Sequence, residues 1–143
     1  MNRPPPELVE TLNQLGYRLM RLLFQEAKEA FARLGFTPLQ AEVLRRLSEG
    51  NPSPTQLAEE MEMSPSQASS LLSHLEDRGL LERALDPGDR RRVLLRLTEE
   101  GRKQVEALKS IWHETFARHL SRLGSRELLA FKEILEKLTR EAA

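Results

Sequence analysis

The sequence of 143 residues has no cysteine, seven aromatic side chains and three histidines, and its apolar runs are only a few residues long. Without cysteine the chain can form no disulfide, no thiolate nucleophile, no zinc–thiolate site and no thiol-based redox sensor. The scattered histidines and the lack of a Gly-rich phosphate loop give no support to a metal site, a cofactor or an enzymatic activity. The short apolar runs exclude a bilayer-spanning helix, and residues 1–6 lack the apolar stretch of a signal peptide. We therefore expect a cytoplasmic protein that is not an enzyme and has no membrane partner.

The charge of the chain is balanced in number but not along the sequence. There are 22 basic and 22 acidic residues in a length typical of a single domain, and 39% of the residues are hydrophobic. Residues 53–82 hold six acidic residues against one arginine, whereas residues 83–96 hold five arginines against two aspartates. The net charge of zero is a cancellation between segments, so it does not exclude a polyanionic partner.

Apolar stripes with helical spacing lie at both ends of the chain. They predict one helix over residues 7–34, ended by Gly35, a second that opens at Thr98, and a last helix for which Gly124 breaks the chain and Ser125 is the cap. These stripes offer more apolar surface than one small core needs, and pairing them across a two-fold axis would bury it. Residues 1–34 and 101–143 are therefore expected to be dimerisation helices. The stripes consist of Leu8, Leu12, Leu15, Leu19 and Leu22 at one end and of Leu128, Phe131, Leu135 and Leu138 at the other.

One four-residue pattern occurs three times in the middle of the chain: Thr37-Pro38-Leu39-Gln40, Ser53-Pro54-Thr55-Gln56 and Ser64-Pro65-Ser66-Gln67. The hydroxyl residue can cap the free backbone N–H groups of a helix, proline fits the first turn, and the glutamine three residues on completes a capping box. The pattern predicts three short helices that begin near residues 38, 54 and 65. The second and third are separated by a tight turn, which is typical of a helix-turn-helix.

After Gly79 the pattern changes from helix to strand. Two strands are predicted over residues 80–85 and 93–97, joined by a loop over residues 86–92 with a Pro-Gly turn at its centre. The hairpin would carry Arg90, Arg91 and Arg92 at its tip. The predicted fold is mainly α: a winged helix-turn-helix over residues 37–98, with three short helices and a β-hairpin wing, flanked by N- and C-terminal dimerisation helices.

A winged helix-turn-helix usually binds double-stranded DNA, with the second helix of the motif in the major groove and the hairpin in a neighbouring minor groove. A cationic hairpin tip suits the narrow, strongly negative minor groove of A·T-rich DNA. An alternative hypothesis is a protein-interaction module without DNA affinity, because the second helix of the motif is uncharged on its outer face and residues 53–82 are acidic.

The sequence resembles the MarR family of bacterial transcriptional regulators. The matching residues are Leu71–Arg83, the sequence Asp89-Arg90-Arg91, and Val93–Gly101, and the order of the elements fits over nearly the full length, residues 1–143. The resemblance implies that the helix from Pro65 to Leu75 is the recognition helix, that Asp89-x-Arg91 is the wing signature and that Arg91 enters the minor groove. It also implies a homodimeric repressor on a palindromic operator, released by a small phenolic or otherwise aromatic or anionic effector.

The candidate DNA-binding residues lie at the predicted helix starts near residues 54 and 65, on the recognition helix and on the wing. Family members often carry a basic residue where this chain has Ser70 and His74, so the Arg-to-guanine contact that most often fixes specificity is missing. Gln67 could pair with adenine or be held in its capping box. Ser53 and Thr55 could bind a phosphate group or serve only as helix caps. Asp89 is best interpreted as a structural residue that orients an arginine. The full set is Ser53, Thr55, Ser64, Ser66, Gln67, Ser69, Ser70, Ser73, His74, Asp89, Arg90, Arg91 and Arg92.

Six further residues are candidates for an effector pocket between the dimerisation helices and the DNA-binding part. They are Tyr17, Met20, Phe24, Trp112, His113 and Phe116. Aromatic residues at helical spacing more often pack in a core, so both roles remain open for this set.

Overall fold

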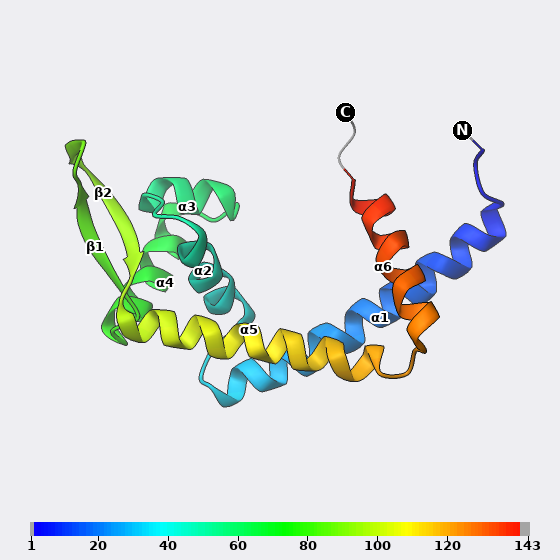
Figure 1. Ribbon diagram of the computed structural model, residues 1–143. Coiled ribbons are helices and arrows are strands. Elements are labelled where there is room, and N and C mark those ends of the chain that lie inside the picture. The colour runs from blue at the N-terminus through cyan, green and yellow to red at the C-terminus, as the bar shows by residue number, and fades with distance from the viewer. Residues whose placement is uncertain (1, 141–143) are drawn as a thin grey trace.

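The computed structural model describes residues 2–140, and over these residues the helices and the hairpin follow one another in the expected order. The DNA-binding motif of the expected fold lies at one end and the two chain termini at the other (Figure 1). The architecture is mainly helical with one antiparallel hairpin, which confirms the winged helix-turn-helix prediction. The elements are α1 (Pro6–Arg33), α2 (Pro38–Glu49), α3 (Pro54–Glu60), α4 (Pro65–Asp77), β1 (Leu81–Asp86), β2 (Asp89–Leu97), α5 (Glu99–Leu120) and α6 (Ser125–Thr139).

The three short helices begin where the repeated four-residue pattern predicts. Each hydroxyl residue accepts a hydrogen bond from the backbone N–H of the glutamine three residues on, and each glutamine side chain accepts one from the backbone N–H of the cap. In α4, for example, Gln67 N donates to Ser64 Oγ at 3.1 Å and Ser64 N donates to Gln67 Oε1 at 3.2 Å. Two helical N–H groups are satisfied at each start, so local chemistry alone determines these boundaries.

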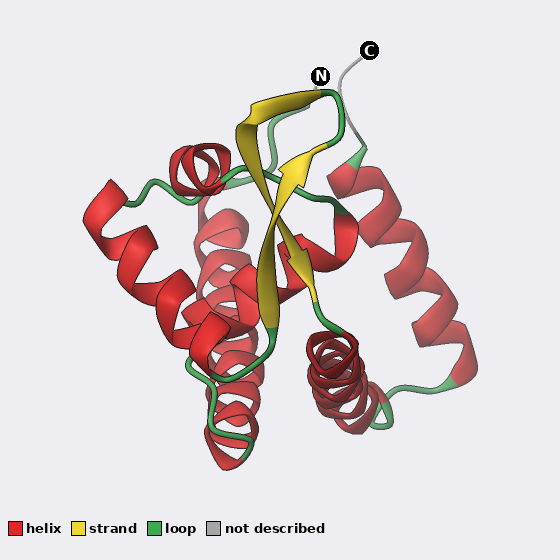
Figure 2. Ribbon diagram, turned by 90° about the vertical axis from the view of Figure 1, so that its left-hand side faces the viewer, coloured by secondary structure: helices red, strands yellow, loops and turns green. Residues whose placement is uncertain are grey.

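The hydrophobic core lies under the helix-turn-helix and does not extend to the ends of the chain. It joins the last turns of α1 to α2, α3, α4, the hairpin and the first half of α5. Figure 2 looks onto the hairpin, with helices behind it and on both sides of it. Its most deeply buried large side chains are Leu44, Leu57, Leu72, Leu75, Leu81 and Leu95.

The helical stripes at the two ends of the chain stay outside this core. Leu12 is 58% exposed and Leu138 is 76% exposed, and no residue of α6 is buried, although that helix lies wholly within the described residues. In Figure 1 the first half of α1 and the whole of α6 extend away from the hairpin. Within residues 2–140 no helix is long and apolar enough to cross a membrane.

The hairpin differs from the expected one in the length of its turn. The turn contains only Pro87 and Gly88, and β2 already begins at Asp89, so the predicted loop over residues 86–92 was wrong. Leu85 pairs with Val93 and Asp86 pairs with Asp89, which leaves Arg90, Arg91 and Arg92 as extra residues in a bulge of β2. The arginines therefore lie beside the turn rather than in it, because the bulge absorbs them.

The start of the last helix is also corrected. Gly124 occupies the N-cap position and Ser125 is the first helical residue, so the prediction that Ser125 caps α6 was one residue out. The backbone N–H of Gly124 donates to Glu127 Oε1 at 3.0 Å, so one free N–H group of the helix start is satisfied from inside the helix.

The start of α5 is held tightly against the turn between α4 and β1. Thr98 N donates to Leu80 O at 3.1 Å, and Thr98 Oγ1 donates to Gly79 O at 2.6 Å. Gly101, in the first turn of α5, comes so close that an added Cβ would lie 2.0 Å from Leu80 O. Only glycine is compatible with this approach.

We expect Gly101→Ala to destabilise the protein by about 3 kcal/mol, the upper end of the range for overpacking, because the clash is with backbone and cannot be relieved by a side-chain rotation. Thermal unfolding followed by circular dichroism measures the loss. Gly50→Ala is the matched control, since nothing lies within 4 Å of an added Cβ there. Equal stability of the two variants would contradict the proposed role of the close approach.

Candidate nucleic-acid interface

The outer face of α4 presents a continuous set of small polar side chains. Ala68, Leu72 and Leu75 are buried against the core, and the residues on the opposite side of the helix are exposed. The spacing of three and four residues places this polar set on one stripe. It contains the candidates Ser66, Ser69, Ser70 and Ser73, with Gln67 and His74 beside them, and all six are exposed.

The hydroxyl groups of the residues that cap α3 and α4 already accept hydrogen bonds from the backbone of these helices. Ser53 and Ser64 each accept from the backbone N–H three residues on. Gln67 is held by its Oε1 atom, which accepts from Ser64 N. A bidentate contact with adenine needs both the oxygen and the nitrogen of a glutamine amide, so that contact competes with the helix cap. Thr55, in the first turn of α3, is exposed.

Arg91 of the wing is almost fully exposed to solvent. Its side chain is 97% exposed, and its Nε atom is 4.0 Å from Asp89 Oδ1. The same Asp89 oxygen accepts a hydrogen bond from the backbone N–H of Arg91 at 3.0 Å. The aspartate therefore shapes the backbone of the bulge and leaves the guanidinium of Arg91 free to reach outward, while Arg90 is also exposed.

Arg92 points to a different partner. Its Nη2 atom donates to Gln56 Oε1 at 2.7 Å, an oxygen that also accepts from Ser53 N at 3.1 Å. Close by, Leu95 N donates to Pro52 O at 2.8 Å. The hairpin is thus attached to the loop and capping box at the start of α3. Of the three wing arginines, Arg92 is the one whose guanidinium group forms a hydrogen bond within the chain. Gln56 and Pro52 were not among the predicted site residues, and no local signal marks them, because the contact with Arg92 spans 36 positions.

The helices α3 and α4 and the hairpin carry charge of opposite sign. Acidic side chains lie at the end of α3 (Glu59 and Glu60) and just after it (Glu62). Near the end of α4, the Glu76 carboxylate lies 3.5 Å from Arg83 Nε. α3 and α4 contain no arginine or lysine, so among these three elements the positive charge lies on the hairpin, where Arg90 and Arg91 are exposed.

The six candidate pocket residues do not come together. Phe24 and Trp112 line a groove of about 420 Å³ with Phe31, and the ring centroids of the two phenylalanines lie 5.8–6.2 Å from that of Trp112. Phe116 lines a second groove of about 440 Å³. Tyr17, Met20 and His113 are exposed and line neither groove. Helical spacing in the sequence does not show which face of α1 turns toward α5.

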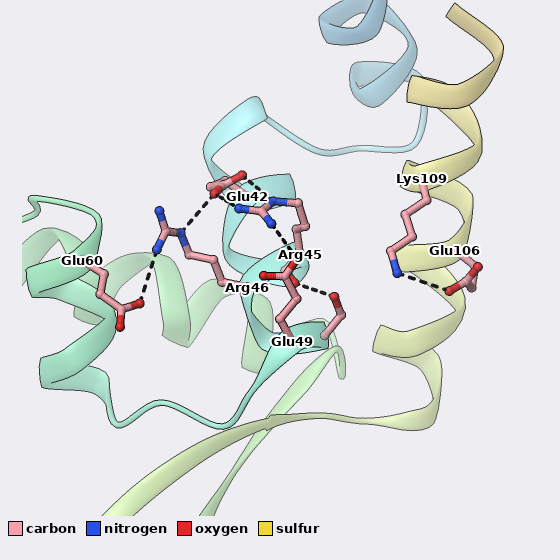
Figure 3. Close-up of polar contacts among 8 residues, drawn as sticks. Glu42, Arg45, Arg46, Glu49, Glu60, Glu106 and Lys109 are labelled. Atoms are coloured by element: carbon pink, nitrogen blue, oxygen red, sulfur yellow. Dashed lines mark hydrogen bonds and ion pairs between the residues drawn. The ribbon is translucent and has the colours of Figure 1, made fainter. Parts of the chain in front are cut away.

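The first groove is apolar but has charged groups at its edge. Arg45 forms hydrogen bonds of 3.0 and 2.6 Å to Glu42, and Figure 3 shows Glu42 between Arg45 and Arg46, with Lys109 on the neighbouring helix. The hydrogen bond from Arg45 lowers the pKa of Glu42, and the bond to Glu42 raises the pKa of Arg45, so both groups are charged at neutral pH. Glu42, Arg45 and Lys109 all line the groove.

Comparison with known proteins gives a consistent result. Residues 34–92 match the model of the MarR family. The chain is 34% identical to the HTH-type transcriptional repressor MdtR of Bacillus subtilis over 86% of this chain and 83% of MdtR. Among solved structures, a point mutant of S. aureus MepR bound to an oligodeoxyribonucleotide is 28% identical, with a TM-score of 0.71 over 88% of this chain and 94% of MepR. A Mycobacterium tuberculosis MarR family protein, RV2887, in complex with p-aminosalicylic acid is 30% identical, with a TM-score of 0.70 over 90% of this chain and 98% of that one.

The capping role of Ser64 can be tested by its effect on stability, with a serine inside α4 as the control. We expect Ser64→Ala to lower the free energy of unfolding by about 1 kcal/mol, because the first turn of α4 loses its cap. Ser69→Ala, at an exposed position inside the same helix, should change it by less than about 0.5 kcal/mol. Chemical denaturation of the two variants makes the comparison, and an unchanged stability of Ser64→Ala would show that the capping box contributes nothing.

Proposed function

Because the chain belongs to the MarR family of transcriptional regulators, we propose that it is a homodimeric repressor that binds a palindromic, A·T-rich operator. Its relatives are transcriptional regulators and not enzymes, and the DNA-binding role is common to the family. The repressor assignment is supported by the name of MdtR, and DNA binding by the MepR mutant that is bound to an oligodeoxyribonucleotide. The observation that carries the proposal is the exposed Arg91 on a hairpin anchored beside the helix-turn-helix.

In this proposal the recognition helix and the wing divide the task of recognition. The serines of α4 enter the major groove and donate to phosphates and base edges, and Arg91 enters the minor groove. Since the outer face of α4 carries no arginine or lysine, affinity depends on the wing and on the shape of the DNA. A narrow minor groove, as in A·T-rich DNA, attracts arginine most strongly.

The dimer is proposed from the exposed apolar faces of α1 and α6. These faces belong to residues 1–34 and 101–143. Residues 37–98 form the winged helix-turn-helix, whose core is closed within one chain by the last turns of α1 and the first half of α5. A second copy of the chain would cover the stripes in a symmetric interface. Two recognition helices related by a two-fold axis lie about 34–36 Å apart on DNA, which requires a palindrome with half-sites one turn apart.

We expect Arg91→Ala to weaken binding to a palindrome selected by the wild-type protein from a random duplex pool about tenfold, or about 1.4 kcal/mol. The slope of log affinity against log salt concentration should fall by about one, because one guanidinium no longer displaces counterions. Fluorescence anisotropy at several salt concentrations measures both.

Lys132→Ala, an equal loss of charge on α6 at the end opposite the wing, is the control and should leave affinity unchanged. Unaltered affinity of Arg91→Ala at physiological salt would contradict the wing assignment. If the wild-type protein selects no duplex at all, the acidic helices point to the alternative, a protein-interaction module.

The effector site is proposed in the apolar groove lined by Phe24 and Trp112. Its walls suit a flat aromatic ring, and Arg45 and Lys109 at its edge suit one carboxylate. The aromatic acid bound by RV2887 supports this ligand class. A bound anion would compete with Glu42 and Glu49, which both accept hydrogen bonds from the Arg45 guanidinium.

Benzoate is a suitable probe, because Trp112 is the single tryptophan of the chain and lines the groove. We expect benzoate to quench its fluorescence in a saturable manner and to release the operator. Arg45→Met should weaken benzoate binding about tenfold, the effect of one charge-assisted contact. Arg46→Met is the matched control, since Arg46 does not line the groove. Equal benzoate affinity in both variants would exclude Arg45 as the anion ligand.

A further inference from the structure

The recognition helix has a side-chain contact with the end of α1 that the proposed function leaves unexplained. Arg78 is the C-cap residue of α4, and the chain then turns through Gly79, at φ +75°, into the hairpin. The Arg78 side chain does not follow the chain into β1 but reaches the corner between α1 and α2. This corner consists of Gly35 and Phe36.

The guanidinium group of Arg78 makes two contacts of different kinds at this corner. Nη1 donates to the carbonyl oxygen of Gly35 at 2.8 Å, and the central carbon lies 4.2 Å from the centroid of the Phe36 ring. Phe36 is 2% exposed and belongs to the core, and Gly35 has a left-handed backbone at φ +83°. A planar guanidinium can donate in its plane and stack through its face at the same time, which an ammonium group cannot do.

The corner is a rigid continuation of α1. Gly35 N donates to Ala32 O at 3.0 Å and Phe36 N donates to Phe31 O at 3.0 Å, so both residues are hydrogen-bonded to the last turn of that helix. The main packing partners of α4 are α3 and β1, whereas those of α1 are α2 and α5. Arg78 therefore bridges the recognition helix directly to the helix whose other end carries the proposed dimer interface.

We propose that Arg78 is a positioning residue that fixes the orientation of α4 relative to α1 and thereby sets the distance between the two recognition helices of the dimer. The consequence for DNA rests on the proposed function: the spacing of the operator half-sites is decided by this contact. One additional base pair rotates the half-sites by about 34° and separates them by about 3.4 Å, so a rigid dimer discriminates sharply between spacings.

The first experiment uses the palindrome selected by the wild-type protein, with its centre lengthened or shortened by one and two base pairs. We expect the wild-type protein to lose affinity at least about tenfold on the altered spacings. Arg78→Met should reduce this preference to less than about threefold, with little change of the salt slope, and Arg78→Lys should restore it only in part. Arg33→Met, an equal loss of charge at the exposed last turn of α1, should keep the wild-type preference.

Two outcomes of this experiment overturn the inference. A full spacing preference in Arg78→Met shows that the contact does not set the geometry. A loss of affinity that is equal for every spacing, with a salt slope lower by about one, shows that Arg78 binds a phosphate instead. If the wild-type protein itself binds every spacing equally, the proposed palindromic dimer fails, and the second experiment decides the role of Arg78 without DNA.

The second experiment measures the distance between α1 and α4 inside one chain. The sequence has no cysteine, so Glu29→Cys and Ser73→Cys, both at exposed positions, accept spin labels without further changes. The labelled protein is mixed with an excess of unlabelled protein, and dipolar spectroscopy gives the distance distribution. We expect Arg78→Met to broaden or shift it while Arg33→Met leaves it unchanged, with thermal unfolding confirming that both variants are folded. An unaltered distribution in folded Arg78→Met would refute the positioning role, as would an equal change in Arg33→Met.

Discussion

The close approach of α5 to the turn after α4 is the constraint on which the rest of the structure depends. Leu80 lies at this point: its N–H donates to Leu75 O at the end of the recognition helix, and its carbonyl accepts from Thr98 N at the start of α5. Because Gly101 has no side chain, the two backbones can meet there. One residue therefore connects the recognition helix, the base of the wing and the long helix that leads away from both.

The wing is fixed a second time at its middle, and this determines which arginines are available. Leu95 is buried and its N–H is bonded to Pro52 O, while Arg92 is bonded to Gln56 on α3. These contacts hold the hairpin beside the helix-turn-helix, and they leave Arg90 and Arg91 exposed in the bulge. A chain with zero net charge can in this way present a local cationic site, although its long-range attraction for a polyanion is weak.

The two ends of the molecule have opposite requirements. The helix-turn-helix is complete in one chain, because its apolar residues are buried in a shared core. The first half of α1 and the whole of α6 have apolar faces that one chain does not cover. The last turns of α1 and the first half of α5 connect the helix-turn-helix to the helices with uncovered apolar faces. The apolar groove lined by Phe31 and Trp112 lies at this connection. A molecule bound in this groove would contact both the core of the helix-turn-helix and the helices α1 and α5, which lead away from it.

The sequence by itself determined the order of the elements, the starts of three helices, the uncharged face of α4 and the family. The helix starts depend on residues that interact within three or four positions, as in the capping boxes of Ser53 and Ser64, and the order of the elements depends on the period of apolar residues. The face of α4 and the family follow from the residue types themselves and their order along the chain. Tertiary structure alone decided that the turn is short, that Arg92 binds Gln56, and that Phe24 faces Trp112 while Tyr17 does not. It also decided the contact between Arg78 and Gly35, which are 43 positions apart. The physical reason is that local hydrogen bonds and hydrophobic periodicity are encoded in neighbouring residues, whereas the choice of a distant partner follows only from how the helices pack.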